Sequence, residues 1–409
     1  MANTLKFGAG QWATKEGSTL AYNDENDNYK PLPFTFTRAS NATVVNKAGL
    51  IETVGNGIPR IDYKDDSEGA FLLEPSRTNN FTDGNNVAET LGVGNANIIQ
   101  NNNTSPTGTL SAAKFTENTL LSSHFARLGA SITGQVAISI FAKADGRNRI
   151  YLTQDFNNGV IFNVNTGVVD SYKGSGFTGS IEDYGNGWYR CIVYTTIASV
   201  GTFYLATLLD GSDSTSYTGD GTSSVLLYGS QLEQGSYATS YIPTQGSAVT
   251  RLADARTDSA LPSTIVSQTE GTIFFKINKS ESTGVANREL IVLETPNRAS
   301  GGLIRVLTTL SKSVMRVLFQ INGGIPFDVN IPSQYTPLNT DLKFAIAFKS
   351  GDSAVYINGV STNTSTSTFT IPEQFDNFYL NFSEVKAKFS EIKLYNTRLS
   401  NSELQALTS

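Results

Sequence analysis

The chain has 409 residues, enough for roughly two to three domains of ordinary size. Only 16% of the residues are charged, and 30 Lys and Arg against 36 Asp and Glu give a net charge of −6. This balance lacks the basic excess that nucleic-acid binding requires. The apolar runs are far shorter than the ~20 residues that span a bilayer, and the first residues do not resemble a signal peptide, so we expect neither membrane insertion nor Sec export.

Cys191 and His124 are the only cysteine and the only histidine. A disulfide within the chain, a Cys/His zinc site and a multi-histidine metal centre are therefore excluded. A Ser–His–Asp triad would have to use His124, and nothing around it resembles a nucleophile elbow. We expect Cys191 to be a small buried apolar residue, and carboxylates remain the only route to an enzyme.

The 36 glycines, the many Asn, Ser and Thr residues and the short alternating apolar runs are typical of an all-β protein. Residues 1–79 contain few runs of strand length and are predicted to form an extended N-terminal connector or assembly segment. Residues 80–250 are predicted to form a β-sandwich from seven short strands, at Ala113–Phe115, Val136–Ala142, Arg149–Gln154, Val160–Asn165, Trp188–Thr195, Thr202–Leu208 and Ser224–Leu232.

Residues 251–262 show little apolar periodicity and are predicted to be a linker. Residues 263–409 carry a second set of strands, among them Thr272–Ile277, Val314–Ile321, Phe344–Phe348 and Phe389–Tyr395. The predicted fold is therefore two β-sandwich (jelly-roll) domains preceded by an extended N-terminal segment.

Two local signals refine the last domain. Asn358 and Gly359 form the dipeptide that accepts positive φ at both central positions of a type I′ hairpin turn. Ser400 and Glu403, three residues apart, form a capping box that predicts a short C-terminal helix.

Four short motifs follow one another near the N-terminus: Arg38–Thr43, Gly49–Glu52, Pro59–Tyr63 and Leu72–Asn79. This succession resembles a signature of bacteriophage and prophage structural proteins, particularly tail and fibre proteins. The middle domain resembles the carbohydrate-binding-module-like sandwich that follows this signature, through Ser139–Ala144, Asn186–Arg190, Gln231–Gly235, Ser240–Thr244 and Thr250–Arg251. The last domain is similar to the concanavalin A-like, laminin-G-like jelly roll, through Glu270–Ile273, Val355–Gly359 and Glu391–Tyr395.

The N-terminal motifs also alternate in charge, which predicts bidentate arginine–carboxylate pairs in a segment with little core of its own; the residues are Arg38, Arg60 and Arg77 with Glu52, Asp62 and Glu74. Two interpretations of the segment remain open. It is either a connector that assembles with other proteins or an added edge of the middle sandwich.

The resemblance to concanavalin-like folds requires a test for glycoside hydrolysis, since these folds include enzymes that place two carboxylates on one strand face. The chain has no alternating Glu-x-Asp-x-Glu run. Glu182 and Asp183 are adjacent and would point to opposite faces, while Glu384 and Glu391 are separated by basic residues. We expect no enzymatic activity, although a pair assembled from different strands stays open.

Metal sites are the next possibility. Asp24–Asn28 begins like a calcium loop but has Tyr29 and Thr35 where an EF-hand needs Gly and Glu. Asp210, Asp213 and Asp220 lie in a Gly/Ser/Thr-rich stretch that could hold a structural calcium, but a solvated loop with Asx turns is the favoured interpretation. No convincing phosphate-binding glycine motif is present, and we predict no metal site and no cofactor.

Sugar binding requires exposed aromatic rings beside polar groups. The middle domain has many candidates: Tyr151, Phe156, Tyr172, Tyr184, Trp188, Tyr189, Tyr217 and Tyr237. Alternation places Trp188 and Tyr189 on opposite faces of one strand, and core packing is favoured for Trp188. The sequence alone does not assign the ligand-binding residues.

The resemblances imply a non-enzymatic virion protein of the phage tail or fibre that binds host surface glycans. One alternative is a capsid or tail decoration or adaptor subunit that only holds other virion proteins, and another is a polysaccharide-degrading enzyme. We expect other virion proteins as partners, a homo-oligomer such as a trimer, and synthesis in the host cytoplasm followed by location in the virion.

Overall fold

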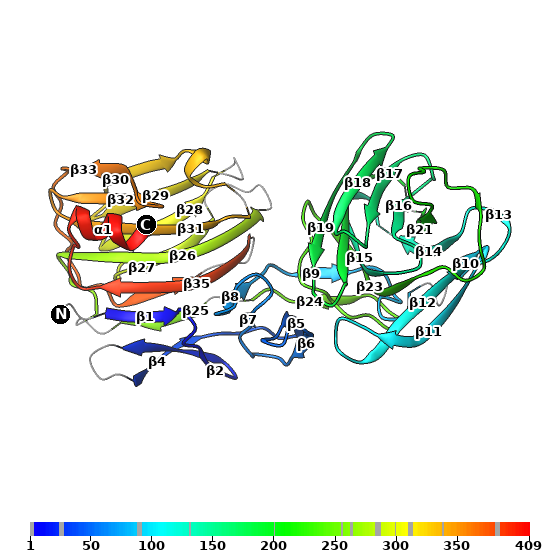
Figure 1. Cartoon of the computed structure of the whole chain (residues 1–409). Helices are drawn as coiled ribbons and strands as arrows, with labels where there is room; N and C mark the ends of the chain where they lie inside the picture. The colour runs from blue at the N-terminus through cyan, green and yellow to red at the C-terminus, as the bar shows by residue number, and fades with distance from the viewer. Residues whose placement is uncertain are drawn as a thin grey trace. The chain divides into compact units, whose positions relative to one another are not determined.

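The structure is a computed structural model, and it describes residues 4–23, 28–87, 92–130, 132–199, 201–254, 257–261, 265–282, 288–298, 300–309, 314–337, 339–380 and 385–409. The chain forms two compact units (Figure 1). The terminal unit contains residues 1–41, 54–76 and 252–409, and the middle unit contains residues 42–53 and 77–251. Both consist of antiparallel β-sheets, so the predicted all-β class is confirmed.

The middle unit has two six-stranded sheets around one core. The first runs β10-β14-β21-β16-β17-β18, which are Val93–Gly94, Phe125–Ala130, Gly201–Leu208, Arg149–Thr153, Gly159–Asn163 and Val168–Lys173. The second runs β11-β12-β23-β15-β20-β19, which are Ala96–Thr104, Leu110–Glu117, Ser224–Gln234, Gly134–Asp145, Tyr189–Ile197 and Phe177–Asp183. Side chains such as Ile138, Leu152 and Val193 fill the space between the sheets. Each of the seven predicted strands overlaps one of these twelve.

Three short strand pairs complete the middle unit. They are β5 with β6 (Ala42–Val45, Ile51–Val54), β9 with β24 (Arg77–Asn79, Val249–Arg251) and β13 with β22 (Leu121–Ser122, Tyr217–Thr218). Val45 and Ile51 pack against Trp188, Tyr228 and Tyr241 on the outer side of the second sheet. Residues that precede position 80 therefore bury apolar surface of this sandwich.

The terminal unit also has two main sheets. The larger has eleven strands, β2-β3-β1-β35-β26-β31-β32-β33 with β4, β7 and β8 attached, and the smaller runs β25-β34-β27-β28-β29-β30. The strands of the larger sheet are Ala13–Lys15, Ser18–Asn23, Thr4–Gly8, Val385–Tyr395, Glu270–Ser282, Asp341–Lys349, Ser353–Ile357, Val360–Ser365, Asn28–Thr35, Ile61–Asp62 and Ala70–Leu73. Those of the smaller sheet are Thr257–Ala260, Asn377–Leu380, Glu289–Glu294, Gly302–Thr308, Met315–Ile321 and Gly324–Ile331.

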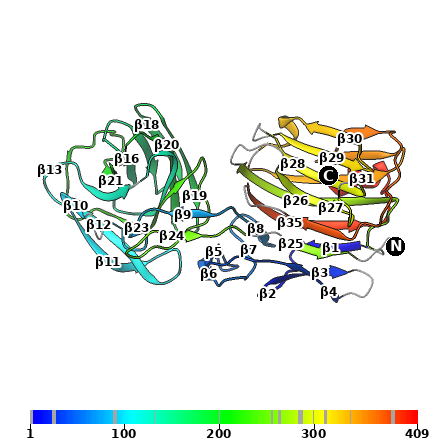
Figure 2. The same ribbon diagram turned by 180° about the vertical axis from the view of Figure 1, so that it is seen from behind.

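Two local predictions for the terminal unit are confirmed. Asn358 and Gly359 have φ values of 47° and 79° and join β32 to β33. Helix α1 (Asn401–Thr408) begins with the predicted capping box of Ser400 and Glu403, and it lies against β31 and β32 (Figure 1). Figure 2 shows the terminal unit from behind, with β28, β29 and β30 labelled. A single-turn 3₁₀ helix spans Ser333–Tyr335. Within the described ranges no helix is long and apolar enough to cross a bilayer.

The prediction of an extended segment over residues 1–79 is corrected by the structure. Strands β1 and β8 both pair with β35, near the other end of the chain. Phe34 and Phe36 alternate into the core of the terminal unit, and Phe71 and Leu73 join them there. The segment is neither a free connector nor an edge of the middle sandwich alone, because its strands belong to both units.

The predicted linker at 251–262 is also structured where it is described. Arg251 ends β24, Asp254 is buried, and β25 pairs with β34 in the smaller sheet. The chain passes between the two units four times, after residues 41, 53, 76 and 251.

The buried ion cluster, which we define as Arg38, Arg60, Glu74 and Asp254, lies in the terminal unit close in sequence to all four passages. All four side chains are fully buried. Arg38 is 3.0 Å from Asp254, Arg60 is 2.8 Å from Glu74, and Arg60 also pairs with Asp254. Burial acts to lower the pKa of Arg60, but Asp254 and Glu74 outweigh it and raise that pKa, so the guanidinium stays charged.

The charge alternation in the N-terminal motifs predicts arginine–carboxylate pairs without assigning partners, and Arg60 with Glu74 is one such pair. The other charged residues take different partners: Asp62 pairs with Lys388 at 2.7 Å, Glu52 accepts a hydrogen bond from Asn46 at 3.0 Å, and the Arg77 guanidinium lies 5.0 Å from the ring centre of Tyr237.

Candidate functional site

The first sheet of the middle unit carries a separate apolar cluster on its outer side, away from the core. Phe125, Ala206 and Tyr151 lie opposite one another across β14, β21 and β16. Phe156 packs onto the same cluster from the loop between β16 and β17. Tyr204 lies two residues from Ala206 and therefore points to the same side. We call Phe125, Tyr151, Phe156 and Tyr204 the aromatic face.

Three rings of the aromatic face contact one another and are partly exposed. The ring centres of Phe125 and Phe156 are 5.4 Å apart, those of Phe125 and Tyr204 are 5.3 Å apart, and those of Phe156 and Tyr204 are 4.7 Å apart. Tyr151 is buried among its neighbours. The Phe125 ring lies over Gly94, where a Cβ would come within 2.3 Å of the ring, so a larger residue at this position would displace the ring.

A compact loop presents Phe156. The hydroxyl of Thr153 accepts a hydrogen bond from the Phe156 amide at 2.9 Å and donates one to the Asn158 carbonyl at 2.7 Å. Asp155 accepts bonds from the amides of Asn157 and Asn158 at 2.9 and 2.8 Å. Burial opposes ionisation of Asp155, but these bonds outweigh it and lower its pKa. Phe156 itself has a φ of 63°, in the left-handed region that a bulky residue seldom adopts.

Two cations border the aromatic face. The Arg127 guanidinium lies 4.9 Å from the ring centre of Phe125 and donates a hydrogen bond to the Val93 carbonyl at 3.2 Å. The Lys173 ammonium lies 5.3 Å from the ring centre of Tyr151 and donates to the Asp213 carbonyl at 3.2 Å.

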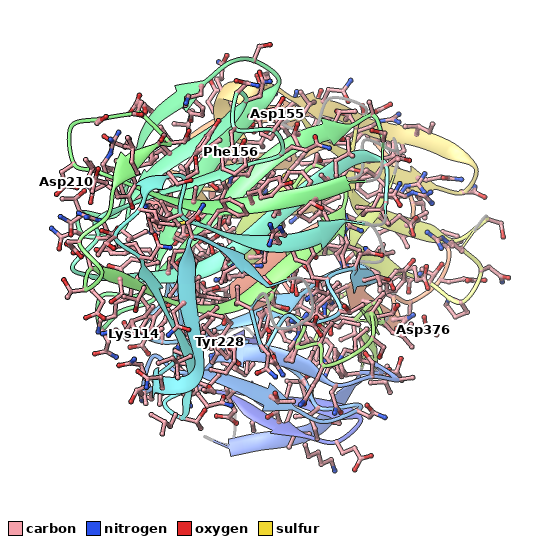
Figure 3. All side chains as sticks on the ribbon, turned by 90° about the vertical axis from the view of Figure 1, so that its right-hand side faces the viewer. Lys114, Asp155, Phe156, Asp210, Tyr228 and Asp376 are labelled. Atoms are coloured by element: carbon pink, nitrogen blue, oxygen red, sulfur yellow. The ribbon has the colours of Figure 1, made fainter. Side chains whose placement is uncertain are left out.

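Arg149 organises the loop that follows β21. Its guanidinium is 2.5 Å from Asp170 and 2.6 Å from Asp213, and it donates to the carbonyls of Leu209 and Ser212 at 3.0 and 2.6 Å. The hydrogen bond from Arg149 lowers the pKa of Asp213. The loop is therefore fixed next to the aromatic face. Figure 3 shows Asp210 on it, while Asp155 and Phe156 lie together on a separate loop at the other end of β16.

The three aspartates considered for calcium do not converge. Asp210 accepts from Asn148 at 2.8 Å, Asp213 pairs with Arg149, and Asp220 accepts from Ser223 and Thr222 within its own loop. In the part of the chain that the structure describes, no group of three His, Cys, Asp or Glu residues could hold a metal ion. The Asp24–Asn28 motif falls largely outside that part.

The other aromatic candidates from the sequence lie elsewhere. Trp188 is only 3% exposed and packs with Tyr228 and Tyr241, so its predicted burial is confirmed, but in the cluster on the outer side of the second sheet and not between the sheets. The ring centres of Tyr184 and Phe141 are 4.8 Å apart. Tyr189 packs against the core between the two sheets, and Tyr237 lies beside Arg77. Tyr172 is 53% exposed but stands between Ser171 and Lys173, on the opposite side of β18.

His124 and Cys191 are both buried in surroundings that indicate a role in stabilising the fold. His124 is buried, with its ring nitrogens 2.6 Å from the Asn95 carbonyl oxygen and 3.2 Å from that of Tyr217. The Tyr217 hydroxyl bonds to Glu117 at 2.6 Å. Cys191 is buried in the core, and burial raises the pKa of its thiol well above the usual range, which disfavours the nucleophilic thiolate.

The carboxylates weighed for hydrolysis do not form a pair in the described residues. Glu182 and Asp183 lie on β19, Glu391 pairs with Lys393 at 2.5 Å, and Glu384 falls outside the described residues.

The terminal unit contains another pair of carboxylates, Glu289 and Glu294, which the sequence alone does not reveal. The Tyr379 hydroxyl lies 3.0 Å from Glu289 and 3.5 Å from Glu294. Arg298 and Arg305 also bind Glu289, the latter at 3.0 Å. Burial opposes ionisation of Glu289, but these partners outweigh it and lower its pKa. An open hollow of about 440 Å³ lies beside Glu294, lined also by Ala260, Thr295, Pro296, Asp376 and Asn377; Asp376 is labelled in Figure 3.

Comparisons with known proteins give only distant structural similarity. No protein-family model matches the sequence, and no curated protein does. The binding domain of botulinum neurotoxin serotype G matches with a TM-score of 0.31 and 12% identity over 37% of this chain and 40% of that one. The binding domain of botulinum neurotoxin DC, solved with rat synaptotagmin II, matches with a TM-score of 0.31 and 13% identity over 38% and 40%.

A sialidase module gives a similar value. The CBM40 domain of the Ruminococcus gnavus IT-sialidase, solved with α2,3-sialyllactose, matches with a TM-score of 0.31 and 15% identity over 38% of this chain and 94% of that one. The chain spans about 40% of the neurotoxin domains it matches. Similarity at this level says nothing about the ligand or activity of this chain.

Proposed function

We propose that this chain is a non-enzymatic glycan-binding protein of a bacteriophage particle, associated with the tail or a fibre, and that the aromatic face holds the glycan. The observation that carries the proposal is the group of three partly exposed, mutually contacting rings with Arg127 and Lys173 at its borders.

The physical argument for a sugar is complementarity. Pyranose rings offer an apolar face and a polar rim, and a cluster of partly exposed aromatic side chains with polar groups beside it matches both. The hydrogen bonds within the Phe156 loop reduce the entropy lost on binding, because the ring is held before the ligand arrives.

The role in a virion is supported by the N-terminal motifs, which resemble those of phage tail and fibre proteins. Several copies in a homo-oligomer, such as a trimer, would add avidity to a weak single site. We further propose that the protein is made in the host cytoplasm and released as part of the virion.

We propose that the protein is not an enzyme because of the groups that surround Glu289. Arg298, Arg305 and the Tyr379 hydroxyl all bind Glu289. A carboxylate held by two guanidinium groups is a weak base and a weak nucleophile.

The test uses the complete chain on an array of bacterial surface glycans and on host cells. Tyr204→Ala and Phe156→Ala should weaken binding by about tenfold, since loss of an aromatic hot-spot contact costs ~1–2 kcal/mol. Tyr172→Ala is the matched control, because it removes an exposed ring from the other side of the same sheet.

Saturable binding that falls in the first two variants and stays in the control supports the proposal. No binding to any glycan, together with capture by other virion proteins, would overturn it in favour of an adaptor. Release of reducing ends from a bound polysaccharide would contradict the non-enzymatic part.

A further inference from the structure

We propose that the glycan held by the aromatic face is acidic, and that Arg127 and Lys173 bind carboxylates on its sugars. This inference rests on the proposed function and specifies the ligand class of the same site. It follows from the register of the first sheet and from the partners of each charge.

Both cations stand in one row on one side of the sheet. Arg127 pairs with Tyr204, Tyr204 with Thr153, Thr153 with Gly159, and Gly159 with Lys173, in the order β14, β21, β16, β17, β18. Residues directly opposite one another across strands share a face. Four strand spacings of ~4.8 Å put the two backbone positions ~19 Å apart, with the aromatic rings between them.

Among the described residues, neither cation forms an ion pair with a carboxylate. Arg127 has the Phe125 ring and the Val93 carbonyl as its contacts, and Lys173 has the Tyr151 ring and the Asp213 carbonyl. Across the described ranges, no carboxylate lies within ion-pair distance of either group. Two other arginines of this unit do have such partners: Arg147 binds Glu117, and Arg149 binds Asp170 and Asp213.

The carboxylates near this face are committed to other groups. Asp170 and Asp213 share Arg149, and Asp213 also accepts from the Ser171 hydroxyl at 3.1 Å. Asp155 accepts hydrogen bonds from Asn157 and Asn158 in its own loop. These bonds engage the three anions with other groups. Only Asp213 also interacts electrostatically with Lys173, and it does so without forming an ion pair, so a ligand carboxylate can still reach Arg127 and Lys173.

The partly buried position strengthens this attraction. Each ammonium or guanidinium group lies against an aromatic ring, which reduces its hydration. An anionic sugar that stacks on Phe156 and Tyr204 would have Arg127 beside it, and a chain long enough to cross the row would also meet Lys173.

The test compares native acidic capsular oligosaccharides with the same oligosaccharides after reduction of their carboxyl groups to alcohols, using the complete chain. Wild-type protein should bind the native forms more tightly, and added NaCl should weaken only this binding. Arg127→Gln and Lys173→Gln should each weaken binding of the native forms by about two- to fivefold and leave binding of the reduced forms unchanged.

Lys143→Gln is the control, because it removes the same charge from the second sheet, where Lys143 donates to the Asn186 carbonyl at 2.7 Å. Equal binding of native and reduced forms, with Phe156→Ala still harmful, would overturn this inference and leave the glycan-binding proposal intact. Absence of binding to both forms would overturn both.

Discussion

At the scale of single residues, the backbone of Phe156 is strained, and this strain affects how its ring is presented for binding. Its φ of 63° places a bulky aromatic residue in the left-handed region, which costs a non-glycine residue of order 1–3 kcal/mol. The bonds from Thr153 and within the Asp155 loop hold it there. Strain of this kind persists where surrounding structure fixes the residue, and at this position it turns the ring toward Phe125 and Tyr204.

Comparing Phe156→Gly with Phe156→Ala separates the effect of backbone strain at this position from the effect of losing the aromatic ring. Both variants lose the ring and should lose glycan binding. The glycine variant should be more stable by about 1 kcal/mol, because glycine adopts positive φ freely. Urea unfolding in a Trp12→Phe background, where Trp188 reports the middle unit, measures the difference. An alanine variant as stable as the glycine variant would show that the left-handed conformation is not retained.

Asp254 is the residue on which the buried ion cluster depends most, since it contacts both Arg38 and Arg60. Asp254→Asn leaves these buried guanidinium groups short of one negative charge and should destabilise the terminal unit by ~3–5 kcal/mol. Trp12 fluorescence in a Trp188→Phe background follows this unit. Asp352→Asn, which changes an exposed carboxylate paired with Arg398, should change stability by less than about 1 kcal/mol. Equal effects of the two substitutions would contradict the role of the cluster.

At the scale of elements, the end of β12 is tied to two other segments through Glu117. Its carboxylate binds Arg147 after β15 at 2.5 Å, the Tyr217 hydroxyl of β22 at 2.6 Å and the Asp220 amide at 2.9 Å. Burial acts to raise the pKa of Glu117, but these partners outweigh it and the pKa is lowered. A lowered pKa means that the folded state favours the ionised form.

The sign of the pH dependence follows. Stability from Glu117 is fully present above the ordinary value of 4.5 and is lost as pH falls through the lower folded pKa. Glu117→Gln should cost ~1–3 kcal/mol at pH 7, and its difference from wild type should shrink below pH 4.5. Thermal midpoints of both proteins between pH 3 and 7 measure this; a difference that is constant across the range would contradict the assignment.

Sequence patterns identify the elements whose formation depends on residues nearby in the sequence. They miss the strands that form only by pairing with a strand far away in the sequence. Alternation predicts β15, β20 and β23, and local chemistry predicts the Asn358-Gly359 turn and α1. Strands β1 and β8 escape prediction because their pairing partner, β35, lies more than 300 residues away. A short strand supported by a distant one needs no long apolar run of its own.

The candidate site is only partly predictable for the same reason. Tyr151 and Phe156 are among the sequence candidates, but nothing local distinguishes them from Trp188 or Tyr184, which lie elsewhere. Phe125, Tyr204, Arg127 and Lys173 come from three further strands, and only register unites them. The one usable signal is the alternation around Tyr204, between the buried Phe203 and Leu205.

For the whole molecule, the two units determine which fragments can fold. Residues 80–250 alone lack β5, β6 and β9, so the apolar surface around Trp188 and Tyr228 loses its cover. We expect this fragment to aggregate and bind hydrophobic dyes. Residues 42–251, with residues 54–76 of the terminal unit replaced by a Gly/Ser linker, should form a monodisperse sandwich. Size-exclusion chromatography of both fragments tests this. A well-behaved 80–250 fragment would show that the N-terminal hairpin is dispensable.

The four passages of the chain between the units also affect how the protein tolerates proteolytic cleavage. When two domains are joined by a single linker, one proteolytic cut releases them from each other. Here a cut at any one passage leaves at least one fragment that still runs through both units, and the other fragment keeps its strands paired, as β1 does with β35. The integrity of the molecule therefore does not depend on any single peptide bond at these passages, and the two fragments of a nicked chain can remain associated.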